Sequence, residues 1–165
     1  MPETSGDVTI VRREYSHPDA VRLIAELQDL YTRIYGSPDA SPIDDNDFVP
    51  PRGALALGYL ADEAVAMGAW RRVGNDRAEL KRMYVADRHR GCGFSRAIIA
   101  WLETSARDHG VGTMVLETNK NHPAAIALYR SAGYSDIPHY GYYADNPDTV
   151  SLARKLRADP EDSPG

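Results

Sequence analysis

A short segment at residues 88–96, RHRGCGFSR, combines two glycines with three arginines. It follows an expected strand at 77–85 and precedes an apolar helical pattern at 95–108. The first backbone N–H groups of a helix have no intrahelical partner, so a strand–turn–helix unit directs several donors at one point. Glycine lets an anion approach the backbone, and arginine adds positive charge. The segment predicts a phosphate-binding turn, the alternative being a tight turn with solvated arginines.

Two common phosphate-binding patterns do not fit this turn. The chain contains no GxxxxGK[ST] run, so a Walker nucleotide site is not predicted. A dinucleotide GxGxxG pattern would need glycine at position 96, which is Arg96. The turn therefore belongs to neither of these two classes of nucleotide site.

Two carboxylates and one phenol in the expected strands and helices have side chains that can accept or donate protons. Glu79 begins one expected strand, Glu117 lies in another, and Tyr129 lies in the helix after it. A carboxylate can take a proton from an amine, which is mostly protonated at neutral pH, and a phenol can donate one. The alternatives are a solvated or ion-paired role for each carboxylate and a packing role for the tyrosine. Strand alternation predicts that Glu79 shares a face with Met83 and Val85.

Changes in hydrophobic period divide the chain into short elements. The expected elements are a strand at 8–15, a helix opened by His17-Pro18-Asp19 and ended by Gly36, a loop at 37–51 with a short helical turn, strands at 53–61, 64–73 and 77–85, a helix at 95–108, a strand at 112–119, a helix at 123–133, and a hairpin within 134–156. This order predicts an α+β (α/β) domain with a mixed sheet. We expect one domain over residues 1–158 and a flexible tail at 159–165.

The overall composition limits the classes of function. The chain has 165 residues and a formal net charge of -5, which argues against nucleic acid as a partner. Cys92 is the single cysteine, so neither an internal disulfide nor a multi-cysteine metal site is expected. No stretch has the length and apolarity of a membrane span, and the N-terminus lacks a signal-peptide pattern. We therefore expect a cytoplasmic protein with no metal and no membrane partner.

Two segments resemble the GNAT superfamily of N-acetyltransferases. ELKRMYVADRHRGCGFSRAIIAWLE resembles that family's strand, pyrophosphate loop and helix, and residues 88–93 match its Arg/Gln-x-x-Gly-x-Gly/Ala signature. A second register, residues 90–95, fits the helix better but places Ser95, a small residue suited to an N-cap, where the family has Gly or Ala. LETNKNHPAAIALYRSAGY (116–134) resembles the family's next strand and helix. The resemblance implies a mixed, mostly antiparallel central sheet flanked by helices on both faces.

The resemblance also implies a co-substrate, acetyl-CoA, and residues that would hold it. The backbone of the third expected strand would pair with the pantetheine arm, the glycine-rich turn would hold the pyrophosphate, and an asparagine position near the second motif would face the pantetheine. The residues at these positions are Met83, Tyr84, Val85, Arg88, Arg90, Gly91, Cys92, Gly93, Phe94, Ser95, Arg96, Asn121 and His122. Cys92 is interpreted as a small spacer, because no activating base accompanies it.

By the same resemblance, an acetyl group would pass to a primary amine by direct attack in a ternary complex. Tyr129 occupies the family's usual general-acid position, where a phenol can protonate the departing CoA sulfur. Members of the family place a general base at the position of Glu79 or at that of Glu117, and some use no dedicated base. Both carboxylates therefore remain candidates.

The acceptor site of the family forms from the first helix region and a hairpin near the C-terminus, here 31–52 and 135–148. The acidic and aromatic residues there are Asp39, Asp44, Asp45, Asp47, His139, Tyr140, Tyr142, Tyr143, Asp145 and Asp148. Such a rim would suit a cationic amine of a small molecule or a peptide, unless these loops are simply solvated surface.

Two other functions are possible from the sequence, and so is a homodimer. A GNAT-fold module could bind CoA without catalysis, and a different phosphate-binding protein could use the same turn. Homodimers are common in the family, although no residue pattern in this chain specifies one.

Overall fold

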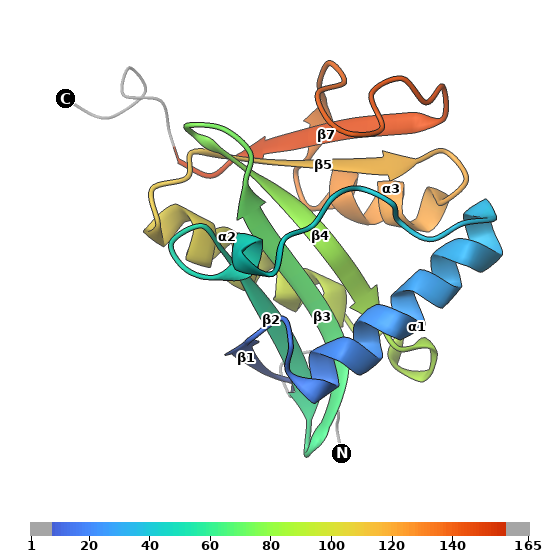
Figure 1. The fold of residues 1–165 in the computed structure, drawn as a ribbon, viewed down its shortest axis with the longest axis vertical. Helices are drawn as coiled ribbons and strands as arrows, with labels where there is room; N and C mark the ends of the chain where they lie inside the picture. Colours follow the sequence, from blue (N-terminus) through green and yellow to red (C-terminus); the bar gives the residue numbers. More distant parts are fainter. Residues whose placement is uncertain (1–7, 158–165) are drawn as a thin grey trace.

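A seven-stranded sheet forms the centre of the computed structural model, which describes residues 8–157. Its strands are β1 (Thr9–Arg13), β2 (Gly53–Leu60), β3 (Glu63–Arg72), β4 (Arg77–Val85), β5 (Thr113–Asn119), β6 (Ser135–Asp136) and β7 (Thr149–Lys155). Their spatial order is β1-β2-β3-β4-β5-β7-β6 (Figure 1). Neighbouring strands run antiparallel except β4 and β5, which are parallel. The tail expected at 159–165 lies outside the described residues.

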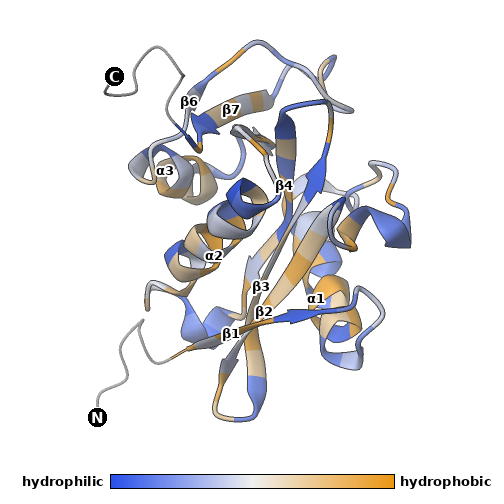
Figure 2. Ribbon diagram, turned by 90° about the vertical axis from the view of Figure 1, so that its left-hand side faces the viewer, coloured by the Kyte–Doolittle hydropathy of each residue, from blue (hydrophilic) through white to orange (hydrophobic). Residues whose placement is uncertain are grey.

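Helices cover both faces of the sheet (Figure 2). α1 (Pro18–Tyr35) lies on one face, and α2 (Phe94–Asp108) and α3 (Pro123–Ser131) lie on the other. α1 begins where predicted, because His17 Nδ1 accepts a hydrogen bond of 3.0 Å from the backbone N–H of Asp19. It ends at Gly36, whose φ of 85° is left-handed. Two short 3-10 turns, η2 (Asp45–Phe48) and η3 (Asp87–His89), complete the elements.

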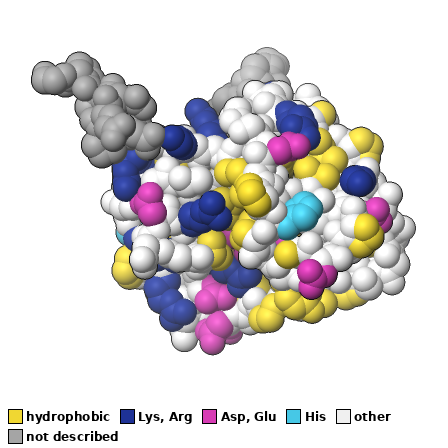
Figure 3. Space-filling model, turned by 90° about the horizontal axis from the view of Figure 1, so that it is seen from above, with side chains coloured by type: hydrophobic (Ala, Val, Ile, Leu, Met, Phe, Trp, Pro, Cys, Tyr) yellow, Lys and Arg dark blue, Asp and Glu magenta, His cyan; other side chains and the backbone are white. Residues whose placement is uncertain are grey.

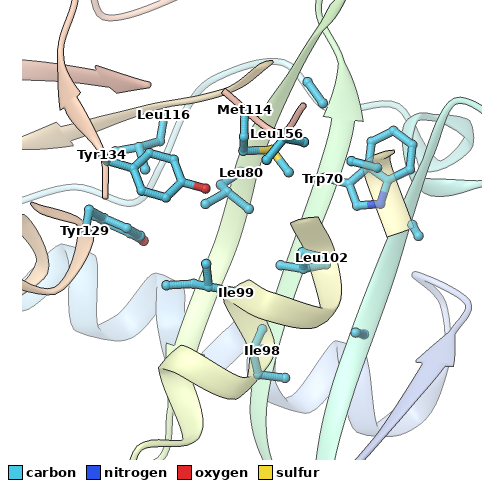
Figure 4. Packing of buried hydrophobic residues seen from close by; sticks show 14 of the residues in the cluster. Trp70, Leu80, Ile98, Ile99, Leu102, Met114, Leu116, Tyr129, Tyr134 and Leu156 are labelled. Atoms are coloured by element: carbon cyan, nitrogen blue, oxygen red, sulfur yellow. The ribbon is translucent and has the colours of Figure 1, made fainter. Parts of the chain in front are cut away.

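Alternation along the central strands divides the core into two layers. On β2, Ala54 and Ala56 pack toward α2 and α3, whereas Leu55 and Leu57 pack toward α1. The first layer includes Trp70 of β3 and Leu102 of α2 (Figure 4). The predicted α+β fold, with a mostly antiparallel mixed sheet between helices, is confirmed.

A bulge in β4 changes which side chains share a face. Arg82 and Met83 together stand opposite Gly68 of β3, and Arg82 has a φ of 60°. Beyond the bulge, Met83 and Val85 pack with the α2 layer. Glu79, before the bulge, instead contacts Arg71 on the α1 side of the sheet. The predicted shared face of Glu79 with Met83 and Val85 is therefore wrong, because the extra residue reverses the alternation.

β4 and β5 pair over only a short distance and then separate. The parallel ladder joins Arg77, Ala78 and Glu79 of β4 to residues 113–115 of β5, and it ends there. In Figure 1 the two ribbons diverge from this point toward α1 and α3. The separation leaves the β5-facing edge of β4 beyond Glu79 without a strand partner, and a cavity opens between the two strands there.

The described helices and the surface seen from above bear on whether the chain has a membrane span or a face of one charge. Among residues 8–157, no helix is long and apolar enough to cross a bilayer. Seen from above, acidic, basic and hydrophobic side chains are interspersed (Figure 3). Within the same residues, no cluster of three or more His, Cys, Asp or Glu side chains could hold a metal ion.

Candidate active site

A cavity of about 860 Å³ opens where β4 and β5 diverge. The C-terminal half of α1 and the segment after it form one wall, and the starts of α2 and α3 form another. Glu79, Glu117 and Tyr129 all line it, together with most of the glycine-rich turn. The structure thus brings the two sequence motifs to a single space.

The glycine-rich turn leaves the start of α2 uncapped. Gly93 is the N-cap residue with a φ of 82°, and no side chain caps the helix. The first turn of α2 also contains no acidic residue that would occupy its positive end. Ser95, which the sequence suggested as a cap, is instead inside the helix, because α2 begins at Phe94. The free N–H groups at this end suit an anionic ligand.

Basic residues around the turn divide into two groups. Arg90 and Arg96 line the cavity, and the Arg90 guanidinium lies 5.9 Å from the ring centre of Tyr84. Arg88 instead forms an ion pair with Glu63 at the β2–β3 turn and does not line the cavity, and neither does the exposed Cys92.

One residue that the sequence analysis did not select also faces this space. His89 lines the cavity, and its Nε2 is buried with no hydrogen-bond partner among the described residues. A buried nitrogen without a partner is costly unless a ligand or water completes it. Sequence offered no signal for this residue beyond its place in the turn.

The remaining expected cofactor contacts also line the cavity. Met83, Tyr84 and Val85 lie along the unpaired edge of β4, and Asn121 and His122 lie where β5 leads into α3. Burial and, secondarily, the positive charge of Arg90 lower the pKa of His122. His122 is therefore neutral at pH 7 and can accept or donate a hydrogen bond there.

The Tyr129 hydroxyl has no hydrogen-bond partner among residues 8–157, although its ring is buried. The ring makes an edge contact with Tyr134, with ring centres 5.9 Å apart (Figure 4). Tyr134 by contrast donates to Glu103. Burial raises the pKa of Tyr129 far above its ordinary value, so the phenol is protonated at neutral pH and can donate.

Both oxygens of Glu79 are already hydrogen-bonded. Arg71 donates to Oε1 from Nε and Nη2, at 3.3 and 3.2 Å, and the Tyr140 hydroxyl donates to Oε2 at 2.6 Å. The side chain is only 6% exposed. Three charge-assisted hydrogen bonds therefore hold the Glu79 carboxylate in place, two at Oε1 and one at Oε2.

Glu117 has fewer partners than Glu79. Its Oε2 accepts one hydrogen bond of 3.1 Å, from the backbone N–H of Tyr143, and Oε1 accepts none from a described residue. Burial and then the negative charge of Glu79 raise the pKa of Glu117 above its ordinary value. A carboxylate in these surroundings has a higher proton affinity and a lone pair available.

Asp39 links the segment after α1 to β4 and to the loop between β6 and β7, all around the cavity. Its carboxylate forms ion pairs with Lys81 and Arg82 of β4 and accepts hydrogen bonds from Ser41 and Tyr143. Burial alone would raise the pKa of Asp39, but Lys81 and the hydrogen bonds from Tyr143 and Ser41 outweigh it and hold that pKa well below its ordinary value. The segment after α1, which crosses the sheet in Figure 1, is anchored by this residue.

The other acidic and aromatic residues of the expected rim are dispersed. Asp47 pairs with Arg71 and Arg52, Asp44 caps η2, and His139 contacts Ser151. Tyr142 is exposed, Asp45 and Asp145 are exposed and do not line the cavity, and Asp148 does line it. The site therefore presents less free negative charge than the sequence suggested, because neighbouring arginines and Lys81 neutralise Asp39 and Asp47. Sequence gave no indication of Lys81 and Arg82, since only the bulge places both beside Asp39.

Comparison with known proteins identifies the family. Residues 21–134 match the model of the acetyltransferase (GNAT) family, and the chain belongs to that family. It is 27% identical over 154 residues to an IAA acetyltransferase of Azospirillum brasilense, covering 91% of this chain and 99% of the other.

Solved structures give the same fold. A Klebsiella pneumoniae chain assigned as an acyl-CoA N-acyltransferase superposes with a TM-score of 0.77 at 28% identity, over 91% of this chain and 98% of that one. A GNAT acetyltransferase of Elizabethkingia anophelis, solved with acetyl-CoA bound, has a TM-score of 0.67 at 14% identity over 90% and 98% of the two chains. The resemblance inferred from the two motifs is confirmed, and with it the acetyltransferase class.

Proposed function

We propose that this protein transfers an acetyl group from acetyl-CoA to a primary amine of a small molecule or peptide, by direct attack in a ternary complex. One observation carries the proposal. A single cavity joins an uncapped, glycine-rich helix start to a protonated tyrosine and to a carboxylate of raised proton affinity. Acyl transfer to an amine can use all three: an anion site for the cofactor, a proton donor and a proton acceptor.

The residues around the turn fit a CoA pyrophosphate. The first N–H groups of α2 have no capping side chain, and Arg90 and Arg96 stand beside them. His89 offers an additional nitrogen without a protein partner. Along β4, the edge at Met83–Val85 has no strand partner on the β5 side, so an extended arm could pair with it, although the Val85 carbonyl already accepts a hydrogen bond of 3.1 Å from Arg90 Nε. Acetyl-CoA would supply the activated acetyl group as a thioester.

We assign the general base to Glu117. Its free Oε1 and raised pKa favour proton uptake from an ammonium group, directly or through a water molecule. Glu79 is a weaker candidate because Arg71 and Tyr140 occupy its oxygens. Glu79 then acts as a positioning residue, since its negative charge contributes to the raised proton affinity of Glu117.

We assign the general acid to Tyr129. Its hydroxyl has no protein acceptor, it lines the cavity, and its proton is retained at neutral pH. It would give that proton to the departing thiolate. This transfer forms the neutral thiol and leaves a phenolate on Tyr129. The second proton that the amine nitrogen loses on becoming an amide would neutralise that phenolate, directly or through water.

The alternative, a CoA-binding module without catalysis, is disfavoured by Glu117. A half-buried carboxylate with a raised pKa costs stability, and such groups concentrate at sites that carry out chemistry. A binding module would need the helix start but not this carboxylate or the free hydroxyl of Tyr129.

Calorimetric titration with acetyl-CoA, with ATP and NAD as controls, tests the first requirement of the proposal. We expect saturable binding of acetyl-CoA and weaker or no binding of the other two. Absence of acetyl-CoA binding to the folded protein would refute both the enzyme and the binding module. An amine screen, treated in the Discussion, separates those two functions.

A further inference from the structure

Lys81 and Arg82 are adjacent in sequence, yet both reach the same atom. Lys81 Nζ lies 3.0 Å and Arg82 Nη1 lies 3.1 Å from Asp39 Oδ2. Consecutive residues of a regular strand point to opposite faces, so this convergence depends on the bulge at Arg82. The left-handed φ of Arg82 is uncommon for a residue with a side chain, and such conformations concentrate at functional sites.

The cluster carries more positive than negative charge. Asp39 is the one carboxylate within ion-pair distance of Lys81 and Arg82 among the described residues, so two cations face one anion. All three side chains are buried, with exposed fractions of 10%, 6% and 10% for Lys81, Arg82 and Asp39. Buried charges are normally balanced, because removing an unpaired charge from water is costly. Glu117 also acts on Lys81 electrostatically, but it makes no ion pair with either cation, so the ion pairs at this end of the cavity hold one more cation than anion.

Arg82 and Lys81 also carry N–H groups that have no acceptor among the described residues. Arg82 donates through Nε to Tyr15 and through Nη1 to Asp39, and its Nη2 has no acceptor among residues 8–157. Lys81 donates to Asp39 and to Ser41, which uses two of its three N–H bonds. A planar guanidinium edge beside an ammonium group is suited to a carboxylate.

The surplus cations and the proposed base face one space. Lys81, Arg82 and Glu117 all line the cavity, and the loop residue Tyr143 contacts both ends of it, through Asp39 and through Glu117. A ligand in this space would meet positive charge at one end and a proton acceptor at the other. Arg71 does not add to the surplus, since Glu79 and Asp47 pair with it.

We infer that the acceptor is a small amine that also carries a carboxylate, as amino acids do, with its carboxylate bound by Arg82 and Lys81 and its amine directed at Glu117. This inference rests on the proposed function, whose acceptor it specifies. A single surplus charge matches a carboxylate better than a polyphosphate, and the neutralised Asp39 and Asp47 give a purely cationic amine little to bind.

The test uses acceptors matched in all but the carboxylate. Amino acids with small, apolar, basic and acidic side chains are each compared with their amides and with the decarboxylated amines, at saturating acetyl-CoA, by thiol release. The amide loses its amine proton more easily than the amino acid, so chemistry without recognition would favour the amide. We expect at least one amino acid to exceed its amide and its amine in kcat/KM by about tenfold or more, the worth of a charge-assisted hydrogen bond.

The variant Lys81→Met tests whether the carboxylate is recognised by the cluster of Lys81 and Arg82. The ratio of kcat/KM for the preferred amino acid to that for its amide should fall toward one, through KM for the amino acid. Lys81→Arg should restore much of the ratio, and the surface control Arg12→Met, on β1, should retain it in full. A cluster that only anchored the segment after α1 would lower the stability of Lys81→Met without changing this ratio.

Three outcomes would overturn the inference. Amines acetylated with no preference for a carboxylate would refute it and leave the proposed function intact. A preference unchanged in Lys81→Met would refute the assignment to this cluster. Failure to acetylate any amine would refute the proposed function, and the inference with it.

Discussion

Gly141 lies directly against the carboxylate of Glu117. A Cβ built on Gly141 would stand 2.6 Å from Oε1 and 2.9 Å from Oε2, closer than any non-bonded contact allows. Two residues later, the backbone N–H of Tyr143 donates to Oε2 at 3.1 Å. The loop between β6 and β7 therefore holds the proposed base with its backbone, and only glycine leaves room for the carboxylate at this point.

Gly141→Ala should displace Glu117 and slow catalysis. The added methyl group would push the carboxylate from its place, and a misplacement of about 1 Å can cost about 10²-fold in rate. We expect kcat to fall while the Kd for acetyl-CoA stays near that of the wild type, because the proposed pyrophosphate site at the start of α2 is separate from Gly141. Thiol-release kinetics and calorimetry on the same preparation measure both quantities. An unchanged kcat would remove Glu117 from the mechanism or show that the loop yields freely.

Glu117→Gln should change both rate and pH dependence. As the pH falls through the raised pKa of Glu117, the wild-type carboxylate becomes protonated and can no longer accept a proton, so kcat/KM falls. The variant should lose this dependence, with a kcat lower by about 10²-fold or more. An acidic limb that persists in Glu117→Gln would assign it to another group.

Glu117→Gln should lower activity but raise the free energy of unfolding near neutral pH. Because folding raises the pKa of Glu117, the folded state favours the protonated form, and the charged form costs stability above that pKa. Glutamine is neutral at every pH, so Glu117→Gln should be more stable than the wild type near pH 7. The difference should shrink as the pH falls through the raised pKa. Denaturant unfolding at several pH values measures it, and a destabilised variant at pH 7 would contradict the expected balance.

How far the sequence could predict this site depended on whether a feature was local. Gly93, Pro123 and Gly36 mark helix ends through their own backbone preferences, so the elements followed from the sequence. The bulge at Arg82 did not, because no residue type in the strand marks it. It lies opposite Gly68, where a Cβ would lie 2.6 Å from Ile98 Cγ2. The strand alternation expected beyond Glu79 therefore failed.

The other features of the site that the sequence did not predict depend on contacts between residues distant in sequence. Tyr129 and Glu117 could be selected from motifs, but the choice between Glu79 and Glu117 depended on Arg71 and Tyr140, which sequence does not place beside Glu79. The sequence shows acidic residues at 31–52 and 135–148 but not their partners, and Asp39 is neutralised by residues about 40 positions away. Identity of a residue type is visible in the sequence, but its electrostatic state is a property of the fold.

Two tyrosines in edge contact provide a matched pair for the general acid. Tyr129→Phe should lower kcat by about 10²-fold and leave stability and the Kd for acetyl-CoA near wild type, because its hydroxyl has no protein partner. Tyr134→Phe removes a 2.7 Å hydrogen bond to buried Glu103 and should cost about 1–3 kcal/mol of stability while retaining kcat. Thermal unfolding and steady-state kinetics distinguish the two. Equal kcat in both variants would exclude Tyr129 as the proton donor.

Two glycines that flank α2 allow an effect on cofactor binding to be distinguished from an effect of backbone strain. Gly93 and Gly110, at the two ends of the helix, have φ values of 82° and 86°, so alanine at either position costs about 1 kcal/mol or more of stability. Gly93 borders the cavity, whereas Gly110 does not. Gly93→Ala should therefore weaken acetyl-CoA binding, and Gly110→Ala should be destabilised to a similar degree with unchanged binding. Equal affinities in the two folded variants would refute the assignment of the turn to the pyrophosphate.

Acetylation of an amine is the central claim, and a direct measurement is available. The protein is mixed with acetyl-CoA and a broad panel of amines, including the amino acids above, and both free thiol and acetylated amine are quantified by mass spectrometry. The account predicts thiol release that depends on the amine, matched mole for mole by N-acetylated product and abolished or strongly reduced in Glu117→Gln. Binding of acetyl-CoA with no acetylated product from any amine would contradict it and favour a CoA-binding module instead.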